Sequence, residues 1–144
     1  EANKRGILTV GLSCCENSPL EGKVDIAITP IVGQEVLTGS TRMKAGTSQK
    51  MVLNMLSTSV MIKLGKVYSN LMVDLKATNK KLVERAKNIF MLITDSDYEA
   101  AEKYLEEANF EVKTAIVMYS CDLPYEKAIT RLEENQGILS KVID

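Results

Sequence analysis

The sequence predicts an α/β fold in which part of a parallel sheet and one long helix precede a small helical bundle. Two short apolar runs separated by a polar loop indicate the sheet. An apolar stretch of helical length indicates the long helix, and amphipathic segments from Asn79 onward indicate the bundle. The composition is that of a soluble globular protein, since 45% of the 144 residues are apolar and 26% are charged.

The two predicted strands are Ile7–Ser13 and Val24–Thr29. The first apolar run is closed by Gly and Ser, and Pro30 stops the second. The segment between them contains Asn, Ser, Pro and Gly, which favours a loop over a tight hairpin turn. We therefore expect the two strands to be neighbours in a parallel sheet whose faces are both covered.

A long helix is predicted from about Ser40 to Leu64, with Gly65 as its stop. In Met51–Leu64, nine of the fourteen residues are apolar, and they do not keep to one stripe. A helix that is apolar on nearly all sides must be buried on nearly all sides. Two strands and a charged tail do not suffice to cover it. We therefore expect the chain to be part of something larger, completed by a missing segment or a partner chain.

The rest of the chain follows an amphipathic helical pattern, with a predicted boundary between residues 1–76 and residues 77–144. Asn79 is a candidate N-cap for the first of these helices, and Ser96–Glu99 has the sequence of a capping box for the second. A short buried helix over Lys113–Tyr119 and a last helix between Pro124 and Gly137 follow. The expected core faces comprise Leu82, Val83, Ala86, Ile89, Phe90, Ile93, Ala101, Tyr104, Leu105, Ala108, Ala128, Ile129 and Leu132.

Composition excludes several classes of function. The net charge of −1 gives no electrostatic reason to expect nucleic acid or a membrane as a partner. The chain contains no histidine, so acid–base chemistry would have to come from carboxylates, lysines, tyrosines or thiols. Three cysteines, Cys14, Cys15 and Cys121, fall short of a structural zinc site, and no metal is expected. Reduced cysteines predict a cytoplasmic protein, with Cys14 and Cys15 either inert or a redox pair.

The segment Thr38–Lys50, "TGSTRMKAGTSQK", is the most informative stretch for function. Gly39 permits a close approach of the backbone to a ligand. The hydroxyls of Ser40 and Thr41 could cap the predicted helix, or they could donate to a ligand at its N-terminus.

Two cations stand in the first turn of the same helix. Arg42 and Lys44 are unusual there, because the N-terminal end of a helix is positive and disfavours cations. They make sense if an anion or a carboxylate compensates them, and Glu35 is the nearest carboxylate in the sequence. The pattern leaves two interpretations open, an ordinary capped helix and the wall of a site for an anionic ligand.

The region Pro30–Leu82 closely resembles the signature region of the bacterial N-acetylmuramic acid 6-phosphate etherases, in the sugar-isomerase (SIS) superfamily of phosphosugar-binding domains. The motif "TGSTRMKAGTSQK", with "LNMLST" and "NLMVD", carries the resemblance. The strand "GILTVGLSC" and the tail "KTAIVMYSCDLPYEKAITRLEENQGILSKVI" resemble the same family, so the likeness covers essentially the whole chain. The tail is also similar to ubiquitin-associated (UBA) three-helix folds.

The resemblance implies a carbon–oxygen lyase that removes D-lactate from N-acetylmuramic acid 6-phosphate and leaves N-acetylglucosamine 6-phosphate, during recycling of cell-wall sugars. In that family carboxylates perform the reaction without a metal or cofactor. The family's serine-rich phosphate loop and its two acid–base carboxylates lie in the half that precedes the matched region. We therefore expect this chain to be the C-terminal part of a phosphosugar-binding domain with its helical tail, inactive alone. A homodimer and a phosphorylated amino sugar are the implied partners.

Six residues can be carried over by motif match as walls of the sugar-phosphate pocket: Glu35, Gly39, Ser40, Thr41, Arg42 and Lys44. In related sugar-isomerase domains a glutamate just before this helix faces the sugar, which makes Glu35 the candidate catalytic residue. A more distant similarity to the glucokinase regulatory protein implies an alternative, a phosphosugar-binding regulatory module without turnover. A third possibility is a structural unit that serves for dimerisation.

Overall fold

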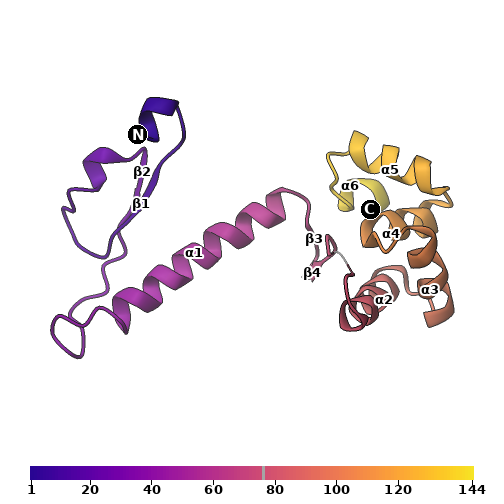
Figure 1. Cartoon of the computed structure of the whole chain (residues 1–144), viewed down its shortest axis with the longest axis horizontal. Helices are drawn as coiled ribbons and strands as arrows, with labels where there is room; N and C mark the ends of the chain where they lie inside the picture. Colours follow the sequence, from indigo (N-terminus) through magenta and orange to yellow (C-terminus); the bar gives the residue numbers. More distant parts are fainter. Residues whose placement is uncertain (76) are drawn as a thin grey trace. The chain divides into compact units, whose positions relative to one another are not determined.

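The chain is a mixed α/β protein, as the sequence predicts in outline (Figure 1). The computed structural model describes residues 1–75 and 77–144. These residues form two compact units, Glu1–Thr58 and Ser59–Asp144. The division falls inside the long helix, and the domain boundary expected after residue 76 stays a prediction. In the described part of the chain, no helix is both long and apolar enough to cross a lipid bilayer.

A short parallel sheet lies in the first unit. β1 (Val10–Leu12) pairs in parallel with β2 (Ile26–Ile28), and Val10 lies opposite Ile26. The parallel pairing confirms the prediction, although both strands are shorter than the apolar runs that predict them. Hydrogen bonds between Thr9 and Asp25 extend the contact between the two segments before the strands begin.

The loop between the strands packs back onto β1. It contains the short 3-10 helix η2 (Glu21–Lys23), and a similar turn, η1 (Asn3–Arg5), precedes β1. Gly11 makes this packing possible, because a Cβ atom at that position would lie only 2.9 Å from the side chain of Leu20. The loop therefore covers part of β1 with its own apolar residues.

α1 (Lys44–Lys63) is the long helix, and it begins at Lys44 rather than near Ser40. Gly65 follows its end as predicted, with a φ of 69° in the left-handed region that glycine adopts without strain. A Cβ atom on Gly65 would lie 2.9 Å from the carbonyl oxygen of Gly137. Gly65 is therefore required by its own backbone conformation and by the approach of a second segment of the chain.

The apolar side chains of α1 are left open. All residues of α1 are described, and none of them is buried. Met51, Leu53 and Met55 are 54%, 51% and 57% exposed. This agrees with the expectation that elements outside this chain are needed to cover the helix. Other exposed apolar side chains in the same unit are Ile7, Leu8, Val10, Ile26, Ile31, Val36, Leu37 and Met43.

The second unit consists of a hairpin and a helical bundle. β3 (Val67–Tyr68) and β4 (Leu71–Met72) pair antiparallel across a two-residue turn, which the sequence did not predict. The bundle helices are α2 (Lys80–Thr94), α3 (Tyr98–Glu107), α4 (Val112–Cys121), α5 (Tyr125–Glu134) and α6 (Ser140–Ile143). The sequence predicts the first four of these, whereas α6 was missed.

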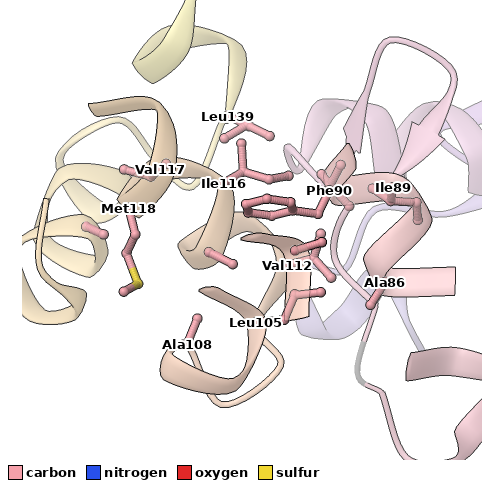
Figure 2. Close-up of a cluster of buried hydrophobic side chains, with 14 of the residues drawn as sticks. Ala86, Ile89, Phe90, Leu105, Ala108, Val112, Ile116, Val117, Met118 and Leu139 are labelled. Atoms are coloured by element: carbon pink, nitrogen blue, oxygen red, sulfur yellow. The ribbon is translucent and has the colours of Figure 1, made fainter. Parts of the chain in front are cut away.

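One cluster of buried apolar side chains holds the bundle together (Figure 2). Phe90 of α2 is fully buried and points toward α4. Its ring stacks on Tyr104 with the ring centroids 6.1 Å apart and meets Tyr119 edge-on at 5.5 Å. The predicted core faces are confirmed in outline, since their buried members are Ala86, Ile89, Phe90, Ala101, Leu105, Ala108, Ala128 and Leu132.

The segment after β4 attaches the hairpin to this bundle. Val73 is 1% exposed and belongs to the core cluster. The next residue, Asp74, forms ion pairs with Lys66 and with Lys113, whose ammonium also donates to the carbonyl of Gly137 at 3.1 Å. Burial raises the pKa of Asp74, but the hydrogen bond from Lys66 and the charge of Lys113 outweigh it and hold that pKa below its ordinary value.

Side chains cap the first two bundle helices. Oδ1 of Asn79 accepts a hydrogen bond from the backbone N–H of Leu82 at 3.0 Å, which confirms the predicted cap of α2. For α3, Oδ1 of Asp97 accepts from the N–H of Ala100 at 2.8 Å. The cap of α3 is thus one residue later than the Ser96 that a capping box would use.

Lys87 joins α2 to α3 through a buried ammonium group. Only 5% of the residue is exposed, and its Nζ donates to the carboxylate of Glu102 and to the hydroxyl of Tyr98. The hydrogen bond to Glu102, followed by that to Tyr98, raises the pKa of Lys87, so the group stays charged. These partners satisfy a cation that burial alone would make costly.

Candidate functional site

A cavity of about 350 Å³ lies in the first unit, at the carboxyl ends of the two parallel strands. In open α/β sheets, ligands bind beyond the carboxyl ends of the strands, which makes this cavity the strongest candidate site. Its walls come from the residues after β1, from the loop after β2 and from the first turns of α1. The lining residues are Leu12, Cys14, Cys15, Val32, Gly33, Glu35, Thr41, Ala45, Gly46 and Gln49.

The loop between β2 and α1 shapes one side of this cavity. Pro30 follows β2 and prevents the strand from continuing. Gly33 and Gly39 then adopt left-handed φ values of 70° and 82°, which turn the chain twice before α1 begins. Gly39 is not among the lining residues, and the prediction that it permits a close approach of the backbone to a ligand stays a prediction.

Glu35 binds the start of α1. Its Oε2 accepts a hydrogen bond from the backbone N–H of Lys44 at 3.1 Å, and its Oε1 accepts one from Ala45 at 3.0 Å. These two bonds, that of Ala45 first, lower the pKa of Glu35 below its ordinary value, with a smaller contribution from the charge of Lys44. Glu35 is therefore the carboxylate that compensates the helix start, and it is ionised at neutral pH.

The other motif residues lie at different distances from the cavity. Thr41 lines it, and its backbone carbonyl accepts a hydrogen bond from the N–H of Gly46 at 3.0 Å. Ser40, Arg42 and Lys44 are not lining residues. In the described part of the chain, neither Arg42 nor Lys44 forms an ion pair with a carboxylate.

The hydroxyl caps considered for this helix are not formed. Among the described residues, the side chains of Ser40 and Thr41 make no hydrogen bond to the first backbone N–H groups of α1. The carboxylate of Glu35 occupies that position instead. A carboxylate nine residues upstream was difficult to identify as a cap, because a capping side chain normally stands directly before its helix.

Sequence reasoning missed two thiols and an amide at the site. Cys14 and Cys15 line the cavity as free cysteines, and the thiol of Cys14 lies 3.8 Å from the carbonyl oxygen of Ala45. Gln49, one turn further along α1, adds an amide. The position of the cysteines directly after β1 was the signal, because the carboxyl ends of parallel strands meet at one edge.

The cavity offers hydrogen-bonding groups and one fixed negative charge. The carboxylate of Glu35, the hydroxyl of Thr41 and the amide of Gln49 are groups that bind sugar hydroxyls. All of the lining residues are described, and none of them is a lysine or an arginine. Within residues 1–75 and 77–144, no group of three or more cysteine, aspartate or glutamate side chains is arranged to hold a metal ion.

Comparison with known proteins identifies close relatives along the whole chain. No family profile matches the chain. The chain is 56% identical over 142 residues to the N-acetylmuramic acid 6-phosphate etherase of Caldanaerobacter subterraneus subsp. tengcongensis. It is 51% identical over 144 residues to the etherase of Shouchella clausii and 52% identical over 143 residues to that of Vibrio campbellii.

These alignments cover at least 99% of this chain but only 46%, 49% and 46% of the three relatives. The chain thus spans about half the length of the curated relatives that it matches. Along nearly its whole length, the chain is homologous to one part of the N-acetylmuramic acid 6-phosphate etherases, the family that its motifs indicated.

Proposed function

We propose that this chain is the C-terminal part of an N-acetylmuramic acid 6-phosphate etherase. The whole protein would cleave the D-lactyl ether of its substrate and release D-lactate and N-acetylglucosamine 6-phosphate, in the cytoplasm. The observation that carries this proposal is an identity of 51–56% to named etherases along the full chain. The cavity at the carboxyl ends of β1 and β2 supports it, because that edge is where such sheets bind ligands.

This chain would supply one wall of the substrate site. Glu35 and Thr41 line the cavity directly. Gly39, with its left-handed φ, and Ser40, whose N–H donates to the carbonyl of Leu37, form the turn that precedes α1. Arg42 and Lys44 would lie at the rim, where they could meet the phosphate. The acid and the base would come from the part of the etherases that this chain does not match. Glu35 does not suit the role of acid, because its lowered pKa leaves no proton to donate at neutral pH.

The same missing part would cover the apolar surface of α1. A hollow of about 600 Å³ beside the helix is lined mainly by apolar residues, including Pro30, Met43, Met51 and Met55. Exposed apolar surface of this kind marks an interaction site. We propose that further strands and helices of a sugar-isomerase domain cover this hollow. We also propose that the tail of the chain is a UBA-like bundle and that the whole enzyme forms a homodimer.

D-lactate release tests the proposed reaction. The full-length protein should release D-lactate from N-acetylmuramic acid 6-phosphate without added metal or cofactor, and residues 1–144 alone should release none. A full-length protein that binds N-acetylglucosamine 6-phosphate but releases no D-lactate would contradict the proposal. That result would favour a regulatory phosphosugar-binding module.

Arg42→Ala tests the proposed rim of the site. We expect the variant to bind N-acetylglucosamine 6-phosphate at least tenfold more weakly, because a charge-assisted hydrogen bond to phosphate contributes roughly 1.5–3 kcal/mol. Its melting temperature should stay unchanged, since Arg42 is exposed and forms no ion pair among the described residues. Lys23→Ala removes an exposed cation outside the cavity and serves as the matched control. Equal affinity in all three proteins would exclude Arg42 from the site.

A further inference from the structure

The first backbone N–H groups of α1 all have partners within the chain. Those of Lys44 and Ala45 donate to Glu35, that of Gly46 donates to the carbonyl of Thr41 at 3.0 Å, and that of Thr47 donates to the carbonyl of Met43 at 3.3 Å. A helix N-terminus binds an external anion through N–H groups that would otherwise be free. In α1 these groups are already used, so the helix start offers no such site.

The charge of the wall points in the same direction. Glu35 contributes a negative charge, and the cavity has no cationic lining residue among those described. A phosphate dianion placed there would be repelled by the carboxylate of Glu35. It would also find no free N–H group at the start of α1 to donate a hydrogen bond to it. A neutral portion of a ligand would meet hydrogen-bonding partners in Thr41, Gln49 and the outer lone pairs of the carboxylate.

We propose that Glu35 is a positioning residue whose carboxylate occupies the anion position at the start of α1 and so reserves this wall for a neutral, hydroxyl-bearing portion of the ligand. It holds the first turn of the helix against the cavity and takes no part in proton transfer. Naming the ligand portion as the sugar rests on the function proposed above. The place of Glu35 at the helix rests only on its two hydrogen bonds.

Amide exchange in the full-length protein tests the first half of this proposal. Glu35→Gln keeps the shape of the side chain but replaces one accepting oxygen with an NH₂ group that cannot accept from an N–H. We expect hydrogen exchange to become at least tenfold faster at one of the two amides of Lys44 and Ala45, the one that loses its acceptor. Glu16→Gln, which alters an exposed carboxylate with no hydrogen bond among the described residues, should leave both rates unchanged. Unchanged rates in Glu35→Gln would overturn the assignment.

Inorganic phosphate tests the second half and separates positioning from a merely structural role. Addition of phosphate to the wild-type protein should give no saturable shift at the amides of Ala45 and Gly46, because an anion held by the rim cations Arg42 and Lys44 would not contact these N–H groups. In Glu35→Ala, which frees two N–H groups, the same titration should give a saturable shift at millimolar phosphate. If Glu35→Ala does not fold, Glu35→Gln should show a weaker shift of the same kind. Phosphate binding at these amides in the wild-type protein would overturn the proposal. Absence of phosphate binding in both Glu35→Ala and Glu35→Gln would also overturn it.

Neutral N-acetylglucosamine identifies the ligand portion. We expect it to shift the resonances of Thr41 and Gln49 in the wild-type protein, whereas phosphate alone should not. A shift of Thr41 and Gln49 by phosphate alone would mean that the wall accepts the anion. The exchange and phosphate experiments need no turnover, so absence of D-lactate release would contradict the proposed function and leave the assignment of Glu35 standing.

Discussion

The two compact units use their apolar residues in opposite ways. In Ser59–Asp144, residues such as Phe90 and Leu105 are fully buried in a common core. In Glu1–Thr58, Val36 and Leu37 remain 78% and 71% exposed, and no residue of α1, all of which are described, is buried. The helices α2, α3 and α5 of the second unit segregate apolar from polar residues, whereas α1 does not. A segregated pattern indicates that a segment completes a core with its neighbours, and an all-round apolar pattern indicates surfaces that other elements must cover.

Two matched leucine substitutions give the largest expected contrast between the units. Leu105→Ala removes a fully buried side chain from α3 and should lower the free energy of unfolding by about 2–5 kcal/mol. Leu53→Ala removes a side chain of α1 that is 51% exposed and should change it by less than about 0.5 kcal/mol in the 144-residue chain. Chemical denaturation followed by circular dichroism measures both. A large loss of stability in Leu53→Ala would show that α1 is already covered in this chain.

Truncation sharpens the boundary between the units. A fragment of residues 59–144 keeps β3, β4 and Val73, while a fragment of residues 77–144 follows the boundary expected from the sequence and loses them. Because Val73 is 1% exposed, the shorter fragment should be less stable by about 1.5–3 kcal/mol from that side chain alone. Comparing their urea unfolding midpoints measures the difference. Equal stability of the two fragments would place the boundary of the folding unit after residue 76.

Helix caps provide a smaller contrast. Asn79→Ala removes the side-chain cap of α2 and should lower the free energy of unfolding by about 1 kcal/mol. Ser40→Ala, near the start of α1, should have an effect below about 0.5 kcal/mol, since its hydroxyl makes no capping bond among the described residues. Thermal unfolding of the two variants distinguishes these outcomes. A clear loss of stability in Ser40→Ala would show that the hydroxyl of Ser40 does cap α1.

Acid should act on the start of α1 with the smallest effect. The pKa of Glu35 is lowered by the N–H groups of Ala45 and Lys44, so its bonds stabilise the helix above the ordinary value of 4.5 and are lost as the pH falls through a value below it. The positive charge of Lys44 lowers the pKa of Glu35 in the same direction, with a smaller effect. The carboxyl ¹³C shift of Glu35 should therefore titrate with a midpoint below 4.5. A midpoint above that value would contradict the hydrogen-bonded geometry.

Local patterns predict the second unit well. The helical spacing of Ala86, Ile89 and Phe90 and the position of Asn79 follow from periodicity and cap chemistry, and both are confirmed. The hairpin of β3 and β4 is missed because each strand has only two residues, too few for an alternating pattern to be visible. The buried ammonium of Lys87 is missed for another reason, since its partners on α3 are brought near only by the tertiary fold.

The candidate site is predicted only in part. The parallel strands and the motif at the start of α1 indicate the edge of the sheet at which the cavity lies, and Glu35 and Thr41 do line that cavity. The roles within the motif cannot be read from spacing, because the bonds from Glu35 to Lys44 and Ala45 depend on how the loop folds back. The place of Cys14 in the wall of the cavity likewise cannot be predicted without knowing which strand ends lie together.

The self-contained hydrogen bonding at the start of α1 has a consequence for affinity. Because Glu35, Thr41 and Met43 satisfy the first turn from within the chain, this wall is ordered before any ligand arrives. Association with a preorganised surface avoids the loss of conformational entropy that accompanies the ordering of a loop. Binding at this wall should therefore proceed as a rigid fit, and the rate of association should be set by access to the cavity rather than by folding of the helix start.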